Sequence, residues 1–147
     1  MRRRNPILLA GGIADALAAA AAAAWPAEAC GLLLGRRDGA AVTVAFFRPT
    51  GNADADPRRG YLIPPLELLA AELEARALEL EIVGVWHSHP DAPAAPSRRD
   101  LEQAWEGYCY GIQAATRAGA GELRFFQLER GAFHGQRWRH LDGGTRR

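Results

Sequence analysis

The most constraining feature of the sequence is a short apolar run that leads directly into two histidines. Residues 82–86 read IVGVW and are followed by His87, Ser88 and His89. A run of this length is too short for a helix and is typical of a buried strand. Because side chains alternate between the two faces of a strand, His87 and His89 share one face, whereas Ser88 points to the other and is expected to be structural. The chain must therefore fold around a buried strand that ends in two imidazoles.

The size and charge of the chain limit the class of protein. It has 147 residues, of which 48% are hydrophobic and 24% charged, with a formal net charge of +1. This length predicts a single domain over 1–147, with an ordered core at about 7–140 and a flexible tail at 141–147. The near-neutral charge does not favour nucleic acid or an anionic membrane as a partner, and no apolar stretch reaches the roughly 20 residues of a membrane span.

The composition excludes several enzyme mechanisms. All 18 basic residues are arginines, so Schiff-base chemistry and the P-loop lysine are absent. The two serines, Ser88 and Ser97, do not lie in a G-x-S-x-G turn. Cys30 and Cys109 are interpreted as buried free thiols of a cytoplasmic protein. The arginine-led, alanine-rich N-terminus resembles a secretory signal, but Asp15 interrupts its apolar run.

The alternation of helical and extended patterns predicts an α+β domain with a mixed, mostly antiparallel sheet flanked by helices. We expect the second helix to form one apolar stripe in the core, made of Leu66, Leu69, Leu73, Ala77 and Leu80. The loop at 49–60 is long and polar, which is more typical of a functional loop than of a connection. The predicted helices are 13–24, 65–80 and one beginning after Ser97, and the predicted strands are 29–35, 41–47, 82–86, 108–115, 122–129 and 132–138.

A carboxylate lies at a suitable place to complete a metal site with the two histidines. Asp100 follows His89 across a proline-rich loop, in the first turn of the third predicted helix. Two histidines, one aspartate and a water are the ligands of a catalytic zinc site, since structural sites usually include cysteine. Such a metal would supply hydroxide near neutral pH. Ser97 and Asp100 also form a capping box, but a cap does not explain two imidazoles on an apolar strand.

These residues resemble the signature of the JAMM (MPN-plus) zinc metalloproteases. The resemblance rests on the letters HSHP at 87–90, on Asp100 with Ser97 in an S-x-x-D pair, and on the segments 26–35 and 82–90, and it extends over roughly residues 7 to 130. It implies a deaminase-like α/β/α fold and the small stand-alone bacterial type of the family. The H-x-E and P-C-x-x-C motifs of zinc deaminases are absent, so deamination is not supported.

The resemblance also implies roles for individual residues. His87, His89 and Asp100 would bind one zinc ion per chain, Glu28 would be the general base, and Ser97 would stabilise the oxyanion. The implied activity is hydrolysis of a peptide or isopeptide bond after the C-terminal Gly-Gly of a ubiquitin-like or sulfur-carrier protein.

Several alternatives stay open at this point. One is a non-catalytic MPN module that binds protein, and another is a zinc hydrolase of a small-molecule amide. Arg58 and Arg59, with residues 61–63, could contact substrate or could form a solvated turn and a core strand. His134 and His140 are interpreted as ordinary residues outside any site.

Overall fold

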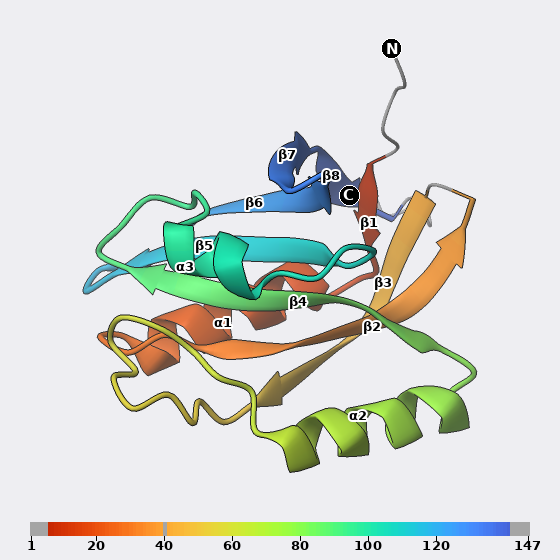
Figure 1. Cartoon of the computed structure of the whole chain (residues 1–147), viewed down its shortest axis with the longest axis horizontal. Coiled ribbons are helices and arrows are strands. Elements are labelled where there is room, and N and C mark those ends of the chain that lie inside the picture. The colour runs from red at the N-terminus through yellow and green to blue at the C-terminus, as the bar shows by residue number, and fades with distance from the viewer. Residues whose placement is uncertain (1–5, 40, 142–147) are drawn as a thin grey trace.

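The structure, a computed structural model, describes residues 6–39 and 41–141. Within this part of the chain one mixed sheet has the strand order β7-β6-β5-β4-β2-β3-β1-β8 (Figure 1). The pairs β4–β5, β1–β3 and β1–β8 are parallel and the other four pairs are antiparallel. The helices are α1 (Ile13–Ala24), α2 (Pro65–Ala77) and α3 (Arg98–Gln103), and the strands are β1 (Ile7–Leu9), β2 (Cys30–Asp38), β3 (Ala41–Thr50), β4 (Glu81–Pro90), β5 (Cys109–Thr116), β6 (Gly119–Glu129), β7 (Ala132–Gln136) and β8 (Trp138–His140).

Helices cover both faces of this sheet, so the predicted α/β/α arrangement is confirmed (Figure 1). On one face α1 buries Ile13, Leu17 and Ala21 in a cluster that includes Leu33 and Trp86. On the other face α2 packs against β2 and β4 in a second apolar cluster. Cys30 and Cys109 are buried free thiols, as predicted. The sheet is therefore buried on both sides at its centre, where β4 lies.

An irregularity in β4 decides which face receives the two histidines. Leu33 of β2 pairs with Gly84 and Leu34 pairs with Ile82, so Val83 is an extra residue in β4. A bulge of this kind shifts the alternation of all residues that follow it. Val85 consequently faces the α2 side, and His87 and His89 follow it onto that face.

The remaining side chain of this segment, Ser88, points to the opposite face. Its Oγ accepts a hydrogen bond of 2.8 Å from the backbone N–H of Ala29. Its own backbone N–H donates to the Ala29 carbonyl at 3.0 Å. The structural role predicted for Ser88 thus consists of joining β4 to the segment that leads into β2.

The prediction that the leucine stripe of the second helix lies in the core is wrong. Leu66, Leu69 and Leu73 are 80%, 52% and 57% exposed, whereas Ala71 and Ala75 are buried against the sheet. The helix has two apolar stripes, and the one with small side chains allows the closer approach to β2 and β4. The helix also ends at Ala77 instead of continuing to residue 80.

Several strand boundaries also differ from the prediction. The first strand, β1, was not anticipated, and residues 132–138 divide between β7 and β8 at opposite edges of the sheet. β4 continues through both histidines to Pro90 instead of ending at Trp86. Of the predicted tail at 141–147, all but Leu141 lie outside the described residues. Within the described part of the chain no helix is long and apolar enough to cross a membrane.

Candidate metal centre

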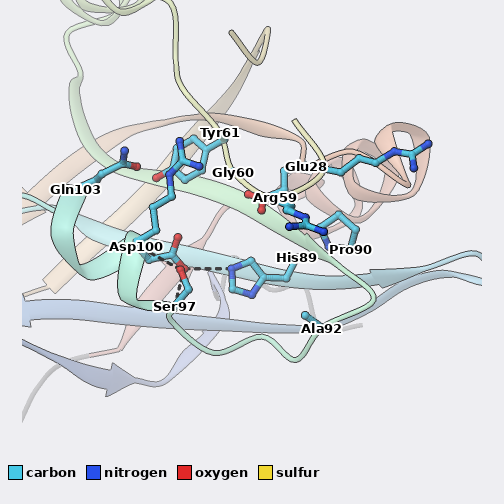
Figure 2. Close-up of a pocket in the computed structure, with 12 residues that line it drawn as sticks. Glu28, Arg59, Gly60, Tyr61, His89, Pro90, Ala92, Ser97, Asp100 and Gln103 are labelled. Atoms are coloured by element: carbon cyan, nitrogen blue, oxygen red, sulfur yellow. Dashed lines mark hydrogen bonds and ion pairs between the residues drawn. The ribbon is translucent and has the colours of Figure 1, made fainter. Parts of the chain in front are cut away.

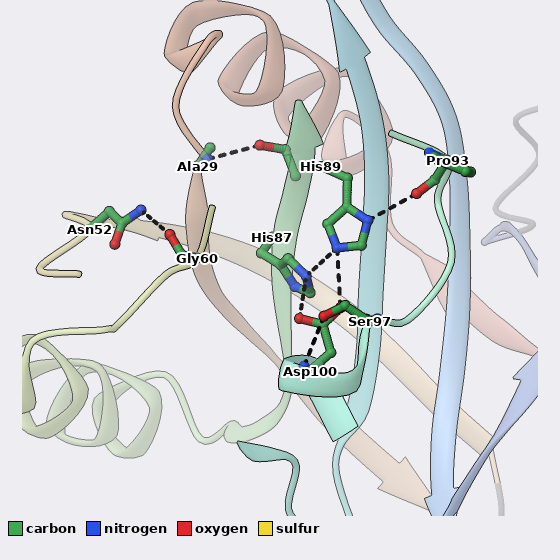
Figure 3. Close-up of polar contacts among 9 residues, drawn as sticks. Ala29, Asn52, Gly60, His87, His89, Pro93, Ser97 and Asp100 are labelled. Atoms are coloured by element: carbon green, nitrogen blue, oxygen red, sulfur yellow. Dashed lines mark hydrogen bonds and ion pairs between the residues drawn. The ribbon is translucent and has the colours of Figure 1, made fainter. Parts of the chain in front are cut away.

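The three predicted metal ligands converge at the end of β4 (Figure 3). The Nε2 atoms of His87 and His89 lie 3.1 Å apart, and Asp100 places Oδ1 3.2 Å from the first and Oδ2 3.1 Å from the second. Zinc–ligand bonds of about 2.0–2.1 Å in a tetrahedral site would set ligand atoms about 3.3 Å apart. The three side chains are therefore arranged as one face of a tetrahedral metal site.

The orientation of Asp100 is fixed by the first turn of α3. The Oγ of Ser97 accepts a hydrogen bond from the Asp100 backbone N–H at 3.0 Å, and the Ser97 backbone N–H donates to Asp100 Oδ2 at 2.9 Å. This is the predicted capping box. The same pair of residues thus caps the helix and aims the carboxylate at the two histidines.

Each imidazole is held by a contact that leaves its Nε2 directed at the cluster. The Nδ1 of His89 lies 2.9 Å from the Pro93 carbonyl, and because a carbonyl only accepts, Nδ1 carries the proton. This tautomer presents the lone pair of Nε2, which is the form that binds a metal. The ring of Tyr61 stacks on His87 with centroids 4.4 Å apart.

The electrostatics of the cluster favour an anionic Asp100 and a neutral His87. Burial alone would raise the pKa of Asp100, but hydrogen bonds with His87 and His89 outweigh it and hold that pKa well below its usual range. Burial lowers the pKa of His87. Burial also acts to lower the pKa of His89, but hydrogen bonds with Asp100 and Pro93 reverse the direction and raise it. An anionic carboxylate beside a neutral buried imidazole suits a divalent metal.

Glu28 reaches the same site from the segment before β2. Cys30 pairs with His87 across the sheet, and extending that antiparallel register by two residues places Glu28 opposite His89. Its side chain is buried, at 8% exposure, and its backbone N–H donates to the Pro57 carbonyl at 2.7 Å. Burial raises the pKa of Glu28 to about 7, close to the value that suits a general base at neutral pH.

The burial of Glu28 predicts a measurable dependence of stability on pH. Because its pKa is about 7 in the folded protein and 4.5 otherwise, the folded state retains a proton that the unfolded state loses over this interval. Relative to Glu28→Gln, the metal-free wild type should lose up to about 3 kcal/mol of unfolding free energy as the pH rises from 4.5 to 7. Urea unfolding of both proteins in chelator at pH 5 and pH 8 measures this, and an equal difference at the two pH values would contradict it.

The loop at 49–60 is held against Glu28 by residues that the sequence did not indicate. The Asn52 Nδ2 donates to the carbonyls of Glu28 and Gly60, each at 3.0 Å, and its Oδ1 accepts from the backbone of Asp54 and Leu62. The second of these amide contacts is drawn in Figure 3. The G-N dipeptide at 51–52 is a turn signal, but nothing in the sequence shows which carbonyls an asparagine will bind.

An ion pair joins this loop to α3. Arg99 pairs with Asp54, whose side chain is buried, and the guanidinium of Arg99 lies against Gly60. A Cβ at Gly60 would overlap the guanidinium of Arg99, so a larger residue there would require the Arg99 side chain to move. The loop that carries Tyr61 is thus connected to the helix that carries Asp100.

Four of the five predicted site residues, namely Glu28, His89, Ser97 and Asp100, line one small pocket of about 190 Å³ (Figure 2). The fifth, His87, is not part of the pocket wall but belongs to the cluster with His89 and Asp100. The pocket wall also contains Tyr61, Gln103 and the three arginines 58, 59 and 99. Within the described residues, His134 and His140 take no part in this pocket or in the cluster of metal-ligating groups.

Comparison with known proteins relates this geometry to a family. Residues 12–129 match the family described as prokaryotic homologs of the JAB domain. A desampylase of Haloferax volcanii is 40% identical over 86 residues, which are 58% of this chain and 60% of that protein. A probable TtuB-protein conjugate cleaving protease of Thermus thermophilus is 38% identical over 79 residues, which are 54% of this chain and 50% of that protein. The chain thus spans about half to three fifths of the length of these curated relatives.

Solved structures match over nearly the whole chain. A protein of Desulfitobacterium hafniense, solved in solution, has a TM-score of 0.82 and 31% identity, with 92% of each chain covered. A JAB1/MPN domain protein of Archaeoglobus fulgidus has a TM-score of 0.53 and 16% identity, with 90% of this chain and 95% of that chain covered, so it shares the fold. The match over residues 12–129, on a chain that carries the expected fold, shows that this protein belongs to the prokaryotic JAB domain family.

Proposed function

We propose that this protein is a zinc-dependent peptidase that hydrolyses the bond after the C-terminal Gly-Gly of a ubiquitin-like or sulfur-carrier protein. The observation that carries the proposal is the meeting of Glu28 in one pocket with His89 and Asp100, two members of a His, His and Asp cluster. A binding module needs neither a metal triad nor a buried carboxylate of raised pKa. The names of the relatives, a desampylase and a conjugate-cleaving protease, support hydrolysis of a protein conjugate.

The proposed chemistry is divided between the triad and Glu28. His87, His89 and Asp100 would hold the zinc, which when bound lowers the pKa of water and polarises a carbonyl. Glu28 accepts the proton of the attacking water and returns it to the leaving amine. This shuttle requires a carboxylate that is easily protonated near pH 7, and the raised pKa of Glu28 meets that requirement.

Ser97 has a hydroxyl that remains able to donate. Its Oγ accepts from the Asp100 backbone N–H, and a serine oxygen can donate its own proton at the same time. The side chain is part of the pocket wall. We assign it the stabilisation of the oxyanion that forms when water adds to the scissile carbonyl.

The shape of the surface beside the zinc ligands suits a Gly-Gly tail. The pocket of about 190 Å³ is too small for a folded domain. It shares Tyr61 and Gln103 with an apolar groove of about 360 Å³ that contains Leu62, Trp105 and Tyr110. Two residues without side chains can pass Tyr61 into the pocket, and the groove can hold the apolar residues that precede them.

Cleavage of a defined adduct tests the proposal. The zinc-loaded protein is incubated with a ubiquitin-fold carrier extended beyond its Gly-Gly terminus, and the released carrier is measured by mass spectrometry. We expect cleavage at the Gly-Gly junction, loss of cleavage in a chelator and recovery when zinc is added back. A zinc-loaded protein that cleaves small amides but no such carrier would instead be a small-molecule hydrolase.

A further inference from the structure

The two imidazoles of the cluster are held in different ways. The Nδ1 of His89 lies 2.9 Å from the Pro93 carbonyl, and this contact orients the ring (Figure 3). The Nδ1 of His87 is buried and has no hydrogen-bond partner within the part of the chain that the structure describes. Histidines that bind a metal almost always use their second nitrogen in such a bond, which fixes the ring orientation. The orientation of His87 must therefore come from another contact.

That contact is made by the ring of Tyr61. Its centroid lies 4.4 Å from the centroid of His87, and the two ring planes differ by only 22°. The ring of His89, in contrast, is tilted by 60° against His87 and does not lie flat on it. The χ2 torsion of histidine has broad energy minima, so hydrogen bonds or packing must set it. Turning the His87 ring about χ2 would break the stack, so Tyr61 opposes the rotation that would move Nε2 away from Asp100.

The position of Tyr61 is set by Asn52, which binds the residue on either side of it. The Nδ2 of Asn52 donates to the Gly60 carbonyl at 3.0 Å, and its Oδ1 accepts from the Leu62 backbone N–H, also at 3.0 Å. An amide side chain that binds both neighbours of a residue fixes the backbone of that residue. The loop at 49–60 therefore presents the Tyr61 ring to His87 in one position.

We infer that Tyr61 is a positioning residue of the metal site, whose ring takes the place of the hydrogen bond that His87 lacks and so raises the affinity of the site for zinc. This inference rests on the proposed function, because it takes the cluster of His87, His89 and Asp100 as the zinc ligands. A ligand that is already in its binding orientation loses less conformational freedom when the metal binds. Stacking requires the aromatic ring of Tyr61 and not its hydroxyl.

Zinc affinity tests the inference better than activity does. Tyr61 also borders the pocket and the apolar groove, so a loss of cleavage alone would not distinguish positioning of His87 from contact with substrate. Zinc affinity is measured by competition with a chromogenic chelator. Tyr61→Leu keeps an apolar side chain but removes the flat ring, and it should bind zinc at least about tenfold more weakly than the wild type. Tyr61→Phe keeps the ring and should bind zinc like the wild type.

A matched control is available at Tyr108. Its side chain packs, like that of Tyr61, against the apolar cluster on the α2 side of the sheet, but among the described residues its ring makes no contact with His87. Tyr108→Leu should therefore keep the zinc affinity of the wild type. The absorption spectrum of the cobalt(II)-loaded protein depends on ligand geometry, so it should change in Tyr61→Leu and stay the same in Tyr61→Phe and Tyr108→Leu.

Proton NMR of the metal-free wild type tests the stack without depending on the folding of any variant. The Tyr61 ring should shift the ring protons of His87 upfield of their positions in free histidine. Absence of this shift would overturn the inference and leave the proposed function intact. Wild-type zinc affinity in Tyr61→Leu, or an equal loss of affinity in Tyr61→Phe or Tyr108→Leu, would do the same. A wild type that binds no zinc would overturn the proposed function, and this inference with it.

Discussion

Glu28→Gln should lower kcat for Gly-Gly cleavage by about 10²–10⁴-fold while the protein still binds one zinc ion per chain. Glutamine has nearly the same shape as glutamate but cannot accept and return a proton. Glu28 is not one of the three residues whose ligand atoms meet within 4.8 Å, so the metal site should survive the change. Cleavage kinetics and elemental analysis of the same sample measure both parts of this prediction.

A matched control separates this loss from a general effect of removing a carboxylate. Glu72 is exposed on α2 and does not line the metal pocket, so Glu72→Gln should cleave like the wild type. If Glu28→Gln retained most of the wild-type kcat, another group would be the base. If Glu28→Gln lost its zinc, the role assigned to this carboxylate would be wrong, since it would then be a ligand.

His89→Ala should lose both the bound zinc and all measurable cleavage. Its Nε2 lies within 3.1 Å of both His87 Nε2 and Asp100 Oδ2, so its removal leaves two ligands where a catalytic site needs three. Elemental analysis after dialysis against a zinc-containing, chelator-free buffer measures the metal. Thermal unfolding measured alongside shows whether the variant is folded.

The control for His89→Ala is a second histidine that lies elsewhere. His140 is exposed on β8 and has its ring 5.4 Å from that of Trp138, so His140→Ala should keep one zinc and full activity. Zinc that persists at one ion per chain in His89→Ala would rule out the assigned triad. A wild type without zinc under the same conditions would leave a capped helix beside two histidines, which fits a binding module.

The sequence was sufficient to predict that His87, His89 and Asp100 meet, because local rules govern their positions. Strand alternation brings His87 and His89 to one face, and a capping box positions Asp100, so neither step requires knowledge of distant contacts. The bulge at Val83 precedes both histidines and changes their face together, which is why the prediction that they share a face holds.

The other residues of the site depend on contacts between distant segments. Glu28 lies opposite His89 only because β2 pairs with β4 in a particular register, and its role was indicated by family resemblance alone. Asn52 acts through hydrogen bonds and Arg99 through an ion pair, and both residues contact segments that are distant in the sequence. No periodic pattern in the sequence predicts such contacts. The buried face of α2 was predicted wrongly because the prediction chose the face with the most hydrophobic side chains, the leucines. Close packing of the helix on the sheet instead favours the face with the small side chains of Ala71 and Ala75.

The bulge divides β4 into a part that tolerates a change of length and a part that does not. Removing Val83 would take away only the extra residue, and Val85, His87 and His89 would keep the face they have now. Removing Val85 would instead move every later side chain of β4 to the other face, so that both imidazoles would enter the apolar layer beneath α1. The spacing from Gly84 to His89 is therefore the length on which the cluster with Asp100 depends.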